Sequence, residues 1–339
     1  MWITPTHREI GFPKIIKLGS PGTVLFGSFM PSPSVAIIDI GSNSIKLLVA
    51  QRADDGYLTA LKSHTIDARI SAGISQVPPQ LSEAGMAVGL EAIESLLAIA
   101  APFNPVRTLL VATSAVRDAI NGEAFRQLVA QRTGHELRIL AGDEEANLIG
   151  HGLTSDPALA DLSDFYLFDL GGGSLECLTF RNRLSVASIS LPLGCVRLTE
   201  RYQPDPTASF GSVARHAVTQ ATRDSLSRSG YVFGLPIPPA AVFAGGSMTT
   251  VRAILAARRG EQLAATTPII QVEEIRSLYE ELAVLPLTTR QTVPGLPASR
   301  ADVFPTALAT ILAIAEAGEI SQFRHTFHNL RWGLAAESL

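Results

Sequence analysis

The stretch FYLFDLGGGSLECLTF at residues 165–180 decides the fold, and a stretch of the same kind, VAIIDIGSNSIKLLVA, occupies residues 35–50. In each stretch an apolar run ends at an aspartate, gives way to glycine and hydroxyl residues, and resumes as a second apolar run. Short apolar runs bounded by glycine are typical of buried β-strands. Each stretch is therefore predicted to form two strands joined by a glycine turn.

The same order of elements follows both stretches. Beginning with the first stretch, the pattern predicts three strands, a helix, a strand and a helix. This βββαβα order begins again with the second stretch, near residue 165. We therefore predict an α/β fold of two duplicated lobes with a cleft between them. The lobes are expected at 34–155 and 156–339, with the last helix packing back on the first lobe, and residues 1–33 are expected to form a poorly ordered extension.

The composition is that of a protein with a sizeable core. Of the 339 residues, 46% are hydrophobic and 17% charged, and the net charge of −4 provides no general attraction to nucleic acid or to an anionic membrane. No apolar run approaches the roughly 20 residues that span a bilayer. The two cysteines, Cys177 and Cys195, are expected to be reduced core residues, so we expect a cytoplasmic protein with neither nucleic acid nor membrane as partner.

The two turns share a pattern that fits phosphate binding. Glycine lets the backbone of a turn take positive φ and lets a ligand approach the main chain closely. Successive N–H groups that point inward then form a nest for anions. An aspartate beside such a nest fits a ligand of Mg²⁺ that bridges to the phosphate. Tight hairpins alone also explain glycine pairs, but two turns of one pattern in a repeated fold favour a site. The candidate residues are the acids Asp39 and Asp169 and the turn residues Gly41, Ser42, Asn43, Ser44, Gly171, Gly172, Gly173 and Ser174.

Glu176 is a further candidate metal ligand. It follows Ser174 by two positions, so both side chains share a face of the returning strand. On that strand Glu176 is expected to lie near Asp169 of the outgoing strand, which would give a pair of carboxylates for a metal. The alternative is an exposed glutamate at the start of a strand.

A third junction of strand, glycines and helix occurs in AVFAGGSMTTVRAI, residues 241–254. The first amides of the helix, around Gly246 and Ser247, are candidates for binding another phosphate. A close strand-to-helix turn that needs glycine explains the same residues almost as well. The chain contains no Gly-Lys pair, which excludes a Walker-type phosphate loop.

Seven motifs together resemble one known family. In order they are DIGSNSIKLLVA, TSAVRDAING, ILAGDEEANLIGHG, FDLGGGSLE, LPLGCVRLTE, FAGGSMTT and LPASRADVFPTALA. They resemble the Ppx/GppA family of exopolyphosphatases and guanosine pentaphosphate phosphatases, over nearly the whole chain from Val35. The resemblance implies the two-lobed actin-like ATPase fold, built from ribonuclease H-like units. Longer members carry a further helical domain of the HD type, which is not found in this sequence, so processivity on long polyphosphate is in question.

The resemblance also implies roles for single residues. Glu145 matches the family's catalytic glutamate, which positions or deprotonates the attacking water; the residues alone do not separate it from the neighbouring Asp143 and Glu144. Asp39, Asp169 and Glu176 match acids at Mg²⁺ or another divalent ion, Arg117 an arginine that faces the phosphates, and Arg69 a basic position in the cleft. Arg117 also fits a helix-surface arginine, and Arg300 equally fits a phosphate contact or a partner for Asp302.

The resemblance implies an enzyme that hydrolyses a terminal phosphoanhydride. Inorganic polyphosphate is the preferred substrate, because it needs only repeated phosphate contacts, and guanosine pentaphosphate is the second. A sensor that binds guanosine tetra- or pentaphosphate without turnover is an alternative, although the complete set of acids argues against it. A sugar kinase of the same superfold ranks lower, because no sugar-binding acid can be assigned. Since relatives commonly dimerise, a homodimer is also an expectation of the resemblance.

Overall fold

Both predicted glycine turns join antiparallel strands in the computed structural model, which describes residues 32–339. The first turn lies between β1 (Ser34–Ile40) and β2 (Ile45–Arg52), the second between β6 (Phe165–Leu170) and β7 (Leu175–Arg181). Every residue of β1 and β6 is buried, which explains why their sequences are almost entirely apolar. The extension expected at 1–33 lies, up to residue 31, outside the described residues.

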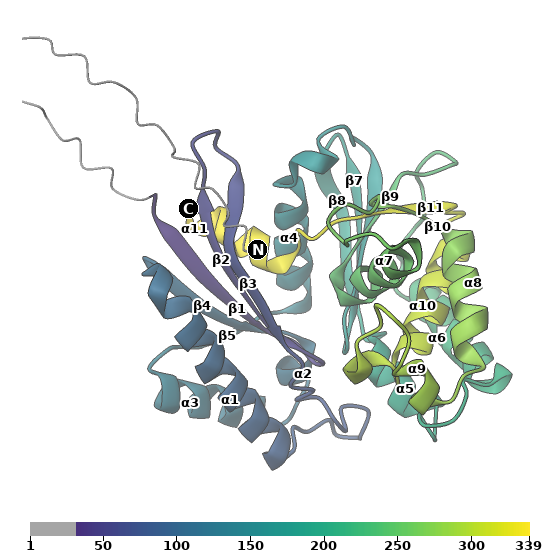
Figure 1. Ribbon diagram of the computed structural model, residues 1–339, viewed down its shortest axis with the longest axis horizontal. Helices are drawn as coiled ribbons and strands as arrows, with labels where there is room; N and C mark the ends of the chain where they lie inside the picture. The colour runs from purple at the N-terminus through teal and green to yellow at the C-terminus, as the bar shows by residue number, and fades with distance from the viewer. Residues whose placement is uncertain (1–31) are drawn as a thin grey trace, which may run out of the picture. The chain divides into compact units, whose positions relative to one another are not determined.

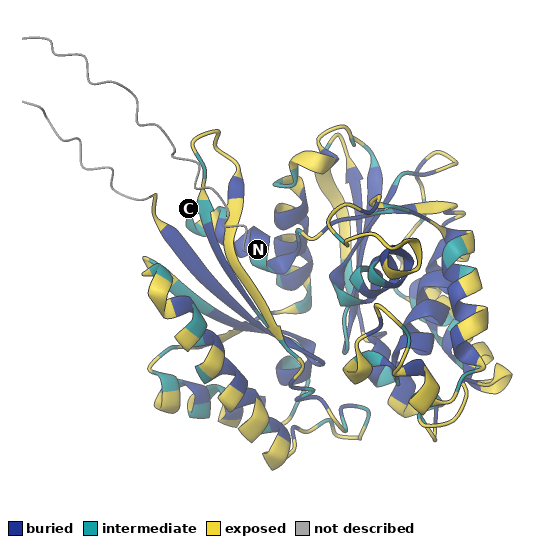
Figure 2. Ribbon diagram, in the orientation of Figure 1, coloured by how far each residue is buried: buried dark blue, intermediate teal, exposed yellow. Residues whose placement is uncertain are grey.

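The first sheet has the strand order β3-β2-β1-β4-β5. β1, β2 and β3 form an antiparallel meander, whereas β4 runs parallel to β1 and β5 parallel to β4. β1 is buried along its whole length, β2 over most of it and β4 in its second half, whereas the edge strand β3 is mostly exposed (Figure 2). The bounds of the added strands are β3 (Leu58–Ile66), β4 (Arg107–Ala112) and β5 (Leu137–Ile139).

The second sheet repeats this order and adds one edge strand. Its order is β10-β11-β9-β6-β7-β8, with β6, β7 and β8 antiparallel, β9 parallel to β6, and β11 parallel to β9. The predicted duplicated α/β fold is therefore confirmed. The sequence analysis missed β10 and β11, since strands this short carry too little pattern. The bounds are β8 (Leu184–Leu191), β9 (Ala241–Ala244), β10 (Ile269–Gln271) and β11 (Gln322–His325).

Helices supply the crossover connections that parallel strands require (Figure 1). We call the part around the first sheet (34–155) the first lobe and the part around the second sheet (156–339) the second lobe. The helices of the first lobe are α1 (Glu83–Ala100), η1 (Ala101–Phe103), α2 (Ser114–Arg117), α3 (Gly122–Thr133) and α4 (Gly142–Thr154). The helices of the second lobe are η2 (Pro157–Leu159), α5 (Cys195–Tyr202), α6 (Ser212–Arg228), α7 (Gly245–Arg259), α8 (Val272–Ala283), α9 (Leu287–Arg290), η3 (Ala298–Arg300), α10 (Phe304–Ala317) and α11 (Leu330–Ser338).

α1 is capped by Ser82, whose hydroxyl accepts a 3.0 Å hydrogen bond from the amide of Gly85. Gly85 itself is explained by packing, because a Cβ there would lie 2.9 Å from the carbonyl oxygen of Ile70. By length and composition alone, Glu83–Phe103 qualifies as a membrane-spanning segment, so the expectation that no apolar run approaches that length is wrong for this helix. Core helices pass the same test, and Leu90 and Ile93 of α1 are buried against the first sheet.

α4 and α11 pair closely between the two sheets (Figure 1). A Cβ on Gly152 would lie 2.1 Å from the carbonyl oxygen of Asn329, and one on Gly333 would lie 1.9 Å from that of Leu148. Only glycine permits this approach of two helix backbones. The core around this pair includes residues of both sheets, such as Ile37 of β1. The start of α4 is therefore held in a fixed position between the lobes.

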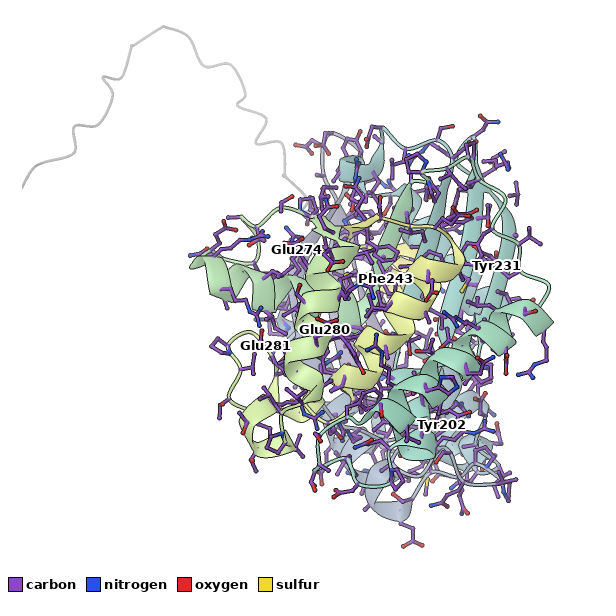
Figure 3. The ribbon with its side chains drawn as sticks, turned by 90° about the vertical axis from the view of Figure 1, so that its right-hand side faces the viewer. Tyr202, Tyr231, Phe243, Glu274, Glu280 and Glu281 are labelled. Atoms are coloured by element: carbon purple, nitrogen blue, oxygen red, sulfur yellow. The ribbon has the colours of Figure 1, made fainter. Side chains whose placement is uncertain are left out.

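The outer side of the second lobe carries α6, α8 and α10. Figure 3 faces these helices and shows Glu274, Glu280 and Glu281 on α8. Two of these acids are paired with arginines of α7: Arg259 binds Glu274 at 2.6 Å, and Arg258 binds Glu281 at 2.8 Å. This acidic helix is thus an exposed surface stabilised by ion pairs.

Candidate active site

The two glycine turns face each other across the interface of the lobes. A Cβ on Gly172 would lie 2.9 Å from the Cβ of Ser42, and one on Gly173 would lie 2.5 Å from the Ser42 hydroxyl oxygen. None of the turn glycines has a positive φ, so the expectation that glycine serves the turn conformation is wrong for these positions. Glycine is needed here because two main chains approach each other closely.

The turns bound a cavity of about 70 Å³. The loop after β4, the start of α4 and the start of α7 complete its wall. Thirteen of the sixteen predicted site residues lie in this wall, so the structure brings most of the candidates together. They are Asp39, Gly41, Ser42, Asn43, Ser44, Glu145, Asp169, Gly171, Gly172, Ser174, Glu176, Gly246 and Ser247.

The expected pairing of Glu176 with Asp169 is observed, since the two residues are direct cross-strand partners on β6 and β7. The duplicated hairpin places Lys46 opposite Asp39 in the same manner. Lys46 therefore occupies in the first turn the position that Glu176 occupies in the second. The sequence analysis missed Lys46, although aligning the two repeats residue by residue would have found it.

Burial raises the pKa of every carboxyl group in this wall. The pKa of Asp169 rises to about 6, and that of Asp39 also rises, although Lys46 and Arg331 oppose both shifts. Burial and the nearby charges of Glu145 and Asp169 raise the pKa of Glu176 well above its ordinary value. Four carboxyl groups that are costly to ionise thus face one small space. A bound cation would stabilise their ionised forms, so the site favours cation binding.

Glu145 is singled out from its neighbours by burial. It is 5% exposed, whereas Asp143 is exposed and Glu144 is bound by Arg138 on the outside of α4. Burial raises the pKa of Glu145 to about 7, against the opposing hydrogen bond from Arg117. The sequence left the choice among Asp143, Glu144 and Glu145 open. In the structure Glu145 is the acid of the three that faces the cavity.

Arg117 and Arg69 do not line the cavity. Arg117 donates a 2.7 Å hydrogen bond to Glu145, so it acts on the site through that carboxylate. Arg69 forms an ion pair with Asp302 and donates 2.6 Å to the carbonyl oxygen of Ser299, which joins the lobes. The resemblance implied that Arg117 faces the phosphates and that Arg69 lines the cleft; in this structure the guanidinium of Arg117 is paired with Glu145 and that of Arg69 with Asp302. Gly173, the third residue outside the wall, contacts the wall residue Ser42.

Arg300 and Arg331 are the other cations at the site. Arg300 lines the cavity and donates 3.2 Å to the Ser44 hydroxyl, while its sequence neighbour Asp302 is taken by Arg69. Arg331 of α11 donates 3.0 Å to the carbonyl oxygen of Leu47, and burial lowers its pKa. A second cavity of about 380 Å³ adjoins the first and contains Lys46, Arg300 and Arg331 in its wall. No sequence pattern marked Arg331, because α11 reaches the site only through the fold.

The third junction also reaches the cavity. A Cβ on Gly245, whose φ is +85°, would lie 2.1 Å from a carboxylate oxygen of Asp169. Ser247 donates a 3.2 Å hydrogen bond to the carbonyl oxygen of Leu170 at the end of β6. No side chain caps α7, and Gly246 and Ser247 of its first turn line the cavity, where the helix dipole favours an anion.

The acids do not form a cage of their own for a metal ion. In residues 32–339 no group of three or more Asp, Glu, His or Cys side chains lies close enough to hold an ion. Mg²⁺ is commonly bound by one or two carboxylates, with waters and substrate phosphates as the remaining ligands. Asp169 and Glu176, adjacent, buried and of raised pKa, fit that mode.

Comparison with known proteins gives a consistent result. The model of the Ppx/GppA phosphatase family matches residues 48–339. A guanosine-5'-triphosphate,3'-diphosphate pyrophosphatase from Pseudoalteromonas translucida is 27% identical over 312 residues, which cover 91% of this chain and 60% of that protein. The chain thus spans less than two thirds of the length of this curated relative.

Two solved structures share the fold. An exopolyphosphatase from Cytophaga hutchinsonii superposes with a TM-score of 0.81 at 19% identity, covering 90% of this chain and 97% of that one. A Ppx/GppA family member from Aquifex aeolicus superposes with a TM-score of 0.73 at 23% identity, covering 91% and 98%. At these identities the structures show a common architecture.

Proposed function

Because this chain belongs to the Ppx/GppA phosphatase family, we propose that it hydrolyses the terminal phosphoanhydride of inorganic polyphosphate and releases orthophosphate. The observation that carries the proposal is the convergence of two glycine turns and a buried glutamate, Glu145, on one polar cavity. Polyphosphate requires only phosphate contacts, and beside its four carboxyl groups this wall offers turn backbone, hydroxyl groups and the cations Lys46 and Arg300.

The terminal phosphates would lie against the turns Gly41–Ser44 and Gly171–Ser174. Lys46 and Arg300 supply positive charge at the same wall, and the open first turn of α7 adds its dipole. Such fixed groups need no rearrangement when negative charge develops in the transition state. This preorganisation is the main source of acceleration in phosphoryl transfer.

Glu145 would receive the proton of the attacking water. A general base is most effective when its pKa lies near the working pH, and burial places the pKa of Glu145 at about 7. Arg117 fixes one carboxylate oxygen of Glu145, which leaves the other to orient the water in line with the scissile bond.

A divalent cation, with Mg²⁺ the first choice, would be held by Asp169 and Glu176, with Asp39 on the opposite turn. When bound, it would neutralise negative charge on the phosphates and on the buried carboxylates. The remaining ligands would be waters and phosphate oxygens.

Guanosine pentaphosphate is the second candidate substrate. The curated relative at 27% identity is named for this nucleotide, and both reactions cleave a phosphoanhydride. The 380 Å³ cavity beside the first is large enough for more than the reacting phosphates. A sensor without turnover is disfavoured, because Glu145, Arg117 and the paired acids are all in place.

The test is phosphate release with Mg²⁺ from short polyphosphate, long polyphosphate and guanosine pentaphosphate. Glu145→Gln should lower the rate by about 10²- to 10⁴-fold, the usual contribution of a general base. Asp143→Asn is the matched control: it makes the same change of carboxyl to amide on the exposed side of the same helix turn.

The substrates separate the candidates. Faster release from polyphosphate supports the first proposal, and release from the nucleotide alone supports the second. Near-wild-type turnover of folded Glu145→Gln would show that the role of Glu145 is wrongly assigned. Nucleotide binding without release of phosphate from any substrate would support the sensor.

A further inference from the structure

Asp118, which the motif TSAVRDAING contains but the function above does not use, joins the two lobes beside Glu145. Its carboxylate forms an ion pair with Arg197 of α5, a helix of the second lobe. The same carboxylate lies 3.4 Å from the Nε atom of Arg117. Asp118 therefore stands between an arginine of each lobe.

The chain of contacts continues at both ends. On the first lobe, Arg117 donates 2.7 Å to Glu145. On the second lobe, the Nε of Arg197 donates 2.9 Å to the carbonyl oxygen of Gly173, in the glycine turn. An unbroken path thus runs from Glu145 through Arg117, Asp118 and Arg197 to Gly173.

The end of this path is rigidly attached to the turn. The amide of Val196 donates 2.9 Å to the carbonyl oxygen of Gly172, and the amide of Arg197 donates 3.2 Å to the same oxygen. A Cβ on Gly194 would lie 2.2 Å from the amide nitrogen of Gly173. The first residues of α5 are therefore joined to the glycine turn by main-chain hydrogen bonds and close packing.

The path is balanced in charge and partly shielded from water. It holds two acids and two arginines, and their side chains are 7% (Glu145), 21% (Arg117), 29% (Asp118) and 14% (Arg197) exposed. Within residues 32–339, Arg197 has no other ion-pair partner than Asp118. Removing the Asp118 charge would leave Arg197 unpaired and would leave Arg117 bound to Glu145 alone.

We propose that Asp118 and Arg197 are positioning residues that set Glu145 relative to the phosphate-binding turn of the opposite lobe. Glu145 belongs to the first lobe and Gly171–Ser174 to the second, so their spacing depends on how the lobes close. The ion pair between Asp118 and Arg197 joins the lobes within the path that ends at Glu145 on one side and at Gly173 on the other. The inference rests on the proposed function, since it assigns the geometry of the same reaction.

Another contact between the lobes provides the comparison. Glu200, on the same helix as Arg197, accepts hydrogen bonds from the amides of Gly73 at 2.8 Å and Ser75 at 3.0 Å. It ties α5 to the first lobe but contacts neither Glu145 nor the glycine turn. A general loosening of the lobes and a loss of positioning can therefore be told apart.

The test compares Asp118→Asn, Arg197→Gln and the double variant with Glu200→Gln, on the full chain with short polyphosphate and Mg²⁺. A misplacement near 1 Å can cost about 10²-fold, so we expect kcat to fall roughly 10- to 100-fold in either single variant. KM should change by less than about threefold, and the double variant should be no slower than the worse single one, since both break one path. Glu200→Gln should retain most of its kcat.

A second readout does not depend on turnover. Amide hydrogen exchange of the segment containing Gly171–Ser174 should be faster in Asp118→Asn and unchanged in Glu200→Gln. An unchanged kcat and exchange rate in folded Asp118→Asn, or an equal loss of kcat in Glu200→Gln, would overturn the inference. If the wild-type protein releases no phosphate, the proposed function fails, and the exchange measurement still decides whether the path holds the turn.

Discussion

Gly173 shows at the scale of a residue why the second turn has three glycines in a row. Its position is enclosed by the Ser114 and Ser42 hydroxyls of the first lobe, and its carbonyl oxygen binds Arg197. A side chain there would separate the surfaces that form the cavity. The glycine thus serves the close contact between the lobes rather than a backbone conformation that only glycine adopts.

Gly173→Ala should therefore lower the free energy of unfolding, by about 1–3 kcal/mol as for other overpacked sites. Its Cβ would lie 2.3 Å from the Ser114 hydroxyl oxygen and 2.5 Å from that of Ser42. Gly171→Ala is the comparison, because its Cβ would meet nothing closer than 3.5 Å. Chemical denaturation should rank Gly171→Ala as clearly more stable than Gly173→Ala, and equal stabilities would refute the steric explanation.

At the scale of elements, the pair α4 and α11 links the site to the core. α4 begins with the turn that carries Glu145, and α11 carries Arg331 to the wall of the adjoining 380 Å³ cavity. Their contact is made by main chain against main chain at Gly152 and Gly333. The position of two charged site residues therefore depends on an apolar helix contact.

We expect Gly333→Ala to be strongly destabilising, although alanine favours helices by about 1 kcal/mol over glycine. Its Cβ would lie 1.9 Å from the backbone carbonyl oxygen of Leu148, which cannot rotate away. Gly150→Ala is the matched variant, because its Cβ would meet side chains of Leu178 and Phe180 at 3.2 Å. Thermal melting should place Gly333→Ala well below Gly150→Ala; the reverse order would contradict the packing argument.

The pattern in the sequence was sufficient for elements and turns but not for contacts between them. The repeated Asp-x-Gly pattern predicted the duplicated fold. Together with the third junction and the family resemblance, it identified the thirteen candidates that line one cavity. It could not show that Arg69 pairs with Asp302, or that α11 delivers Arg331, because such contacts join segments far apart in the chain. It also gave the turn glycines a conformational role, where the structure shows a steric one.

For the whole molecule, the buried acids predict how stability depends on pH. The pKa of Asp169 rises from 3.8 to about 6 and that of Glu145 from 4.5 to about 7, mainly through burial. The folded state holds these protons more tightly than the unfolded state. The two groups therefore contribute fully to the free energy of unfolding when the pH is below their ordinary pKa values. This contribution is lost as pH rises through about 6 to 7.

The metal-free protein should therefore melt at a higher temperature at pH 5.5 than at pH 8, because each tenfold gain in proton affinity on folding stabilises the protonated protein by about 1.4 kcal/mol. Mg²⁺ should raise the melting temperature at pH 8 more than at pH 5.5, because only ionised carboxylates bind it. Calorimetry in chelator and in Mg²⁺ measures both. A melting temperature that rises from pH 5.5 to pH 8 in chelator would contradict this explanation.

Lys46 in the first hairpin and Glu176 in the second occupy equivalent positions but carry opposite charges. This difference affects the orientation in which a linear ligand binds. Two identical hairpins facing each other would form a nearly symmetric cavity, in which a linear ligand would have no preferred orientation. One hairpin here presents Asp39 opposite a lysine, and the other presents Asp169 opposite a glutamate. The charges of the cavity are therefore unequal at its two hairpins. A linear anion meets a lysine at the first hairpin, whereas at the second hairpin it meets two acids and can bind only together with a cation.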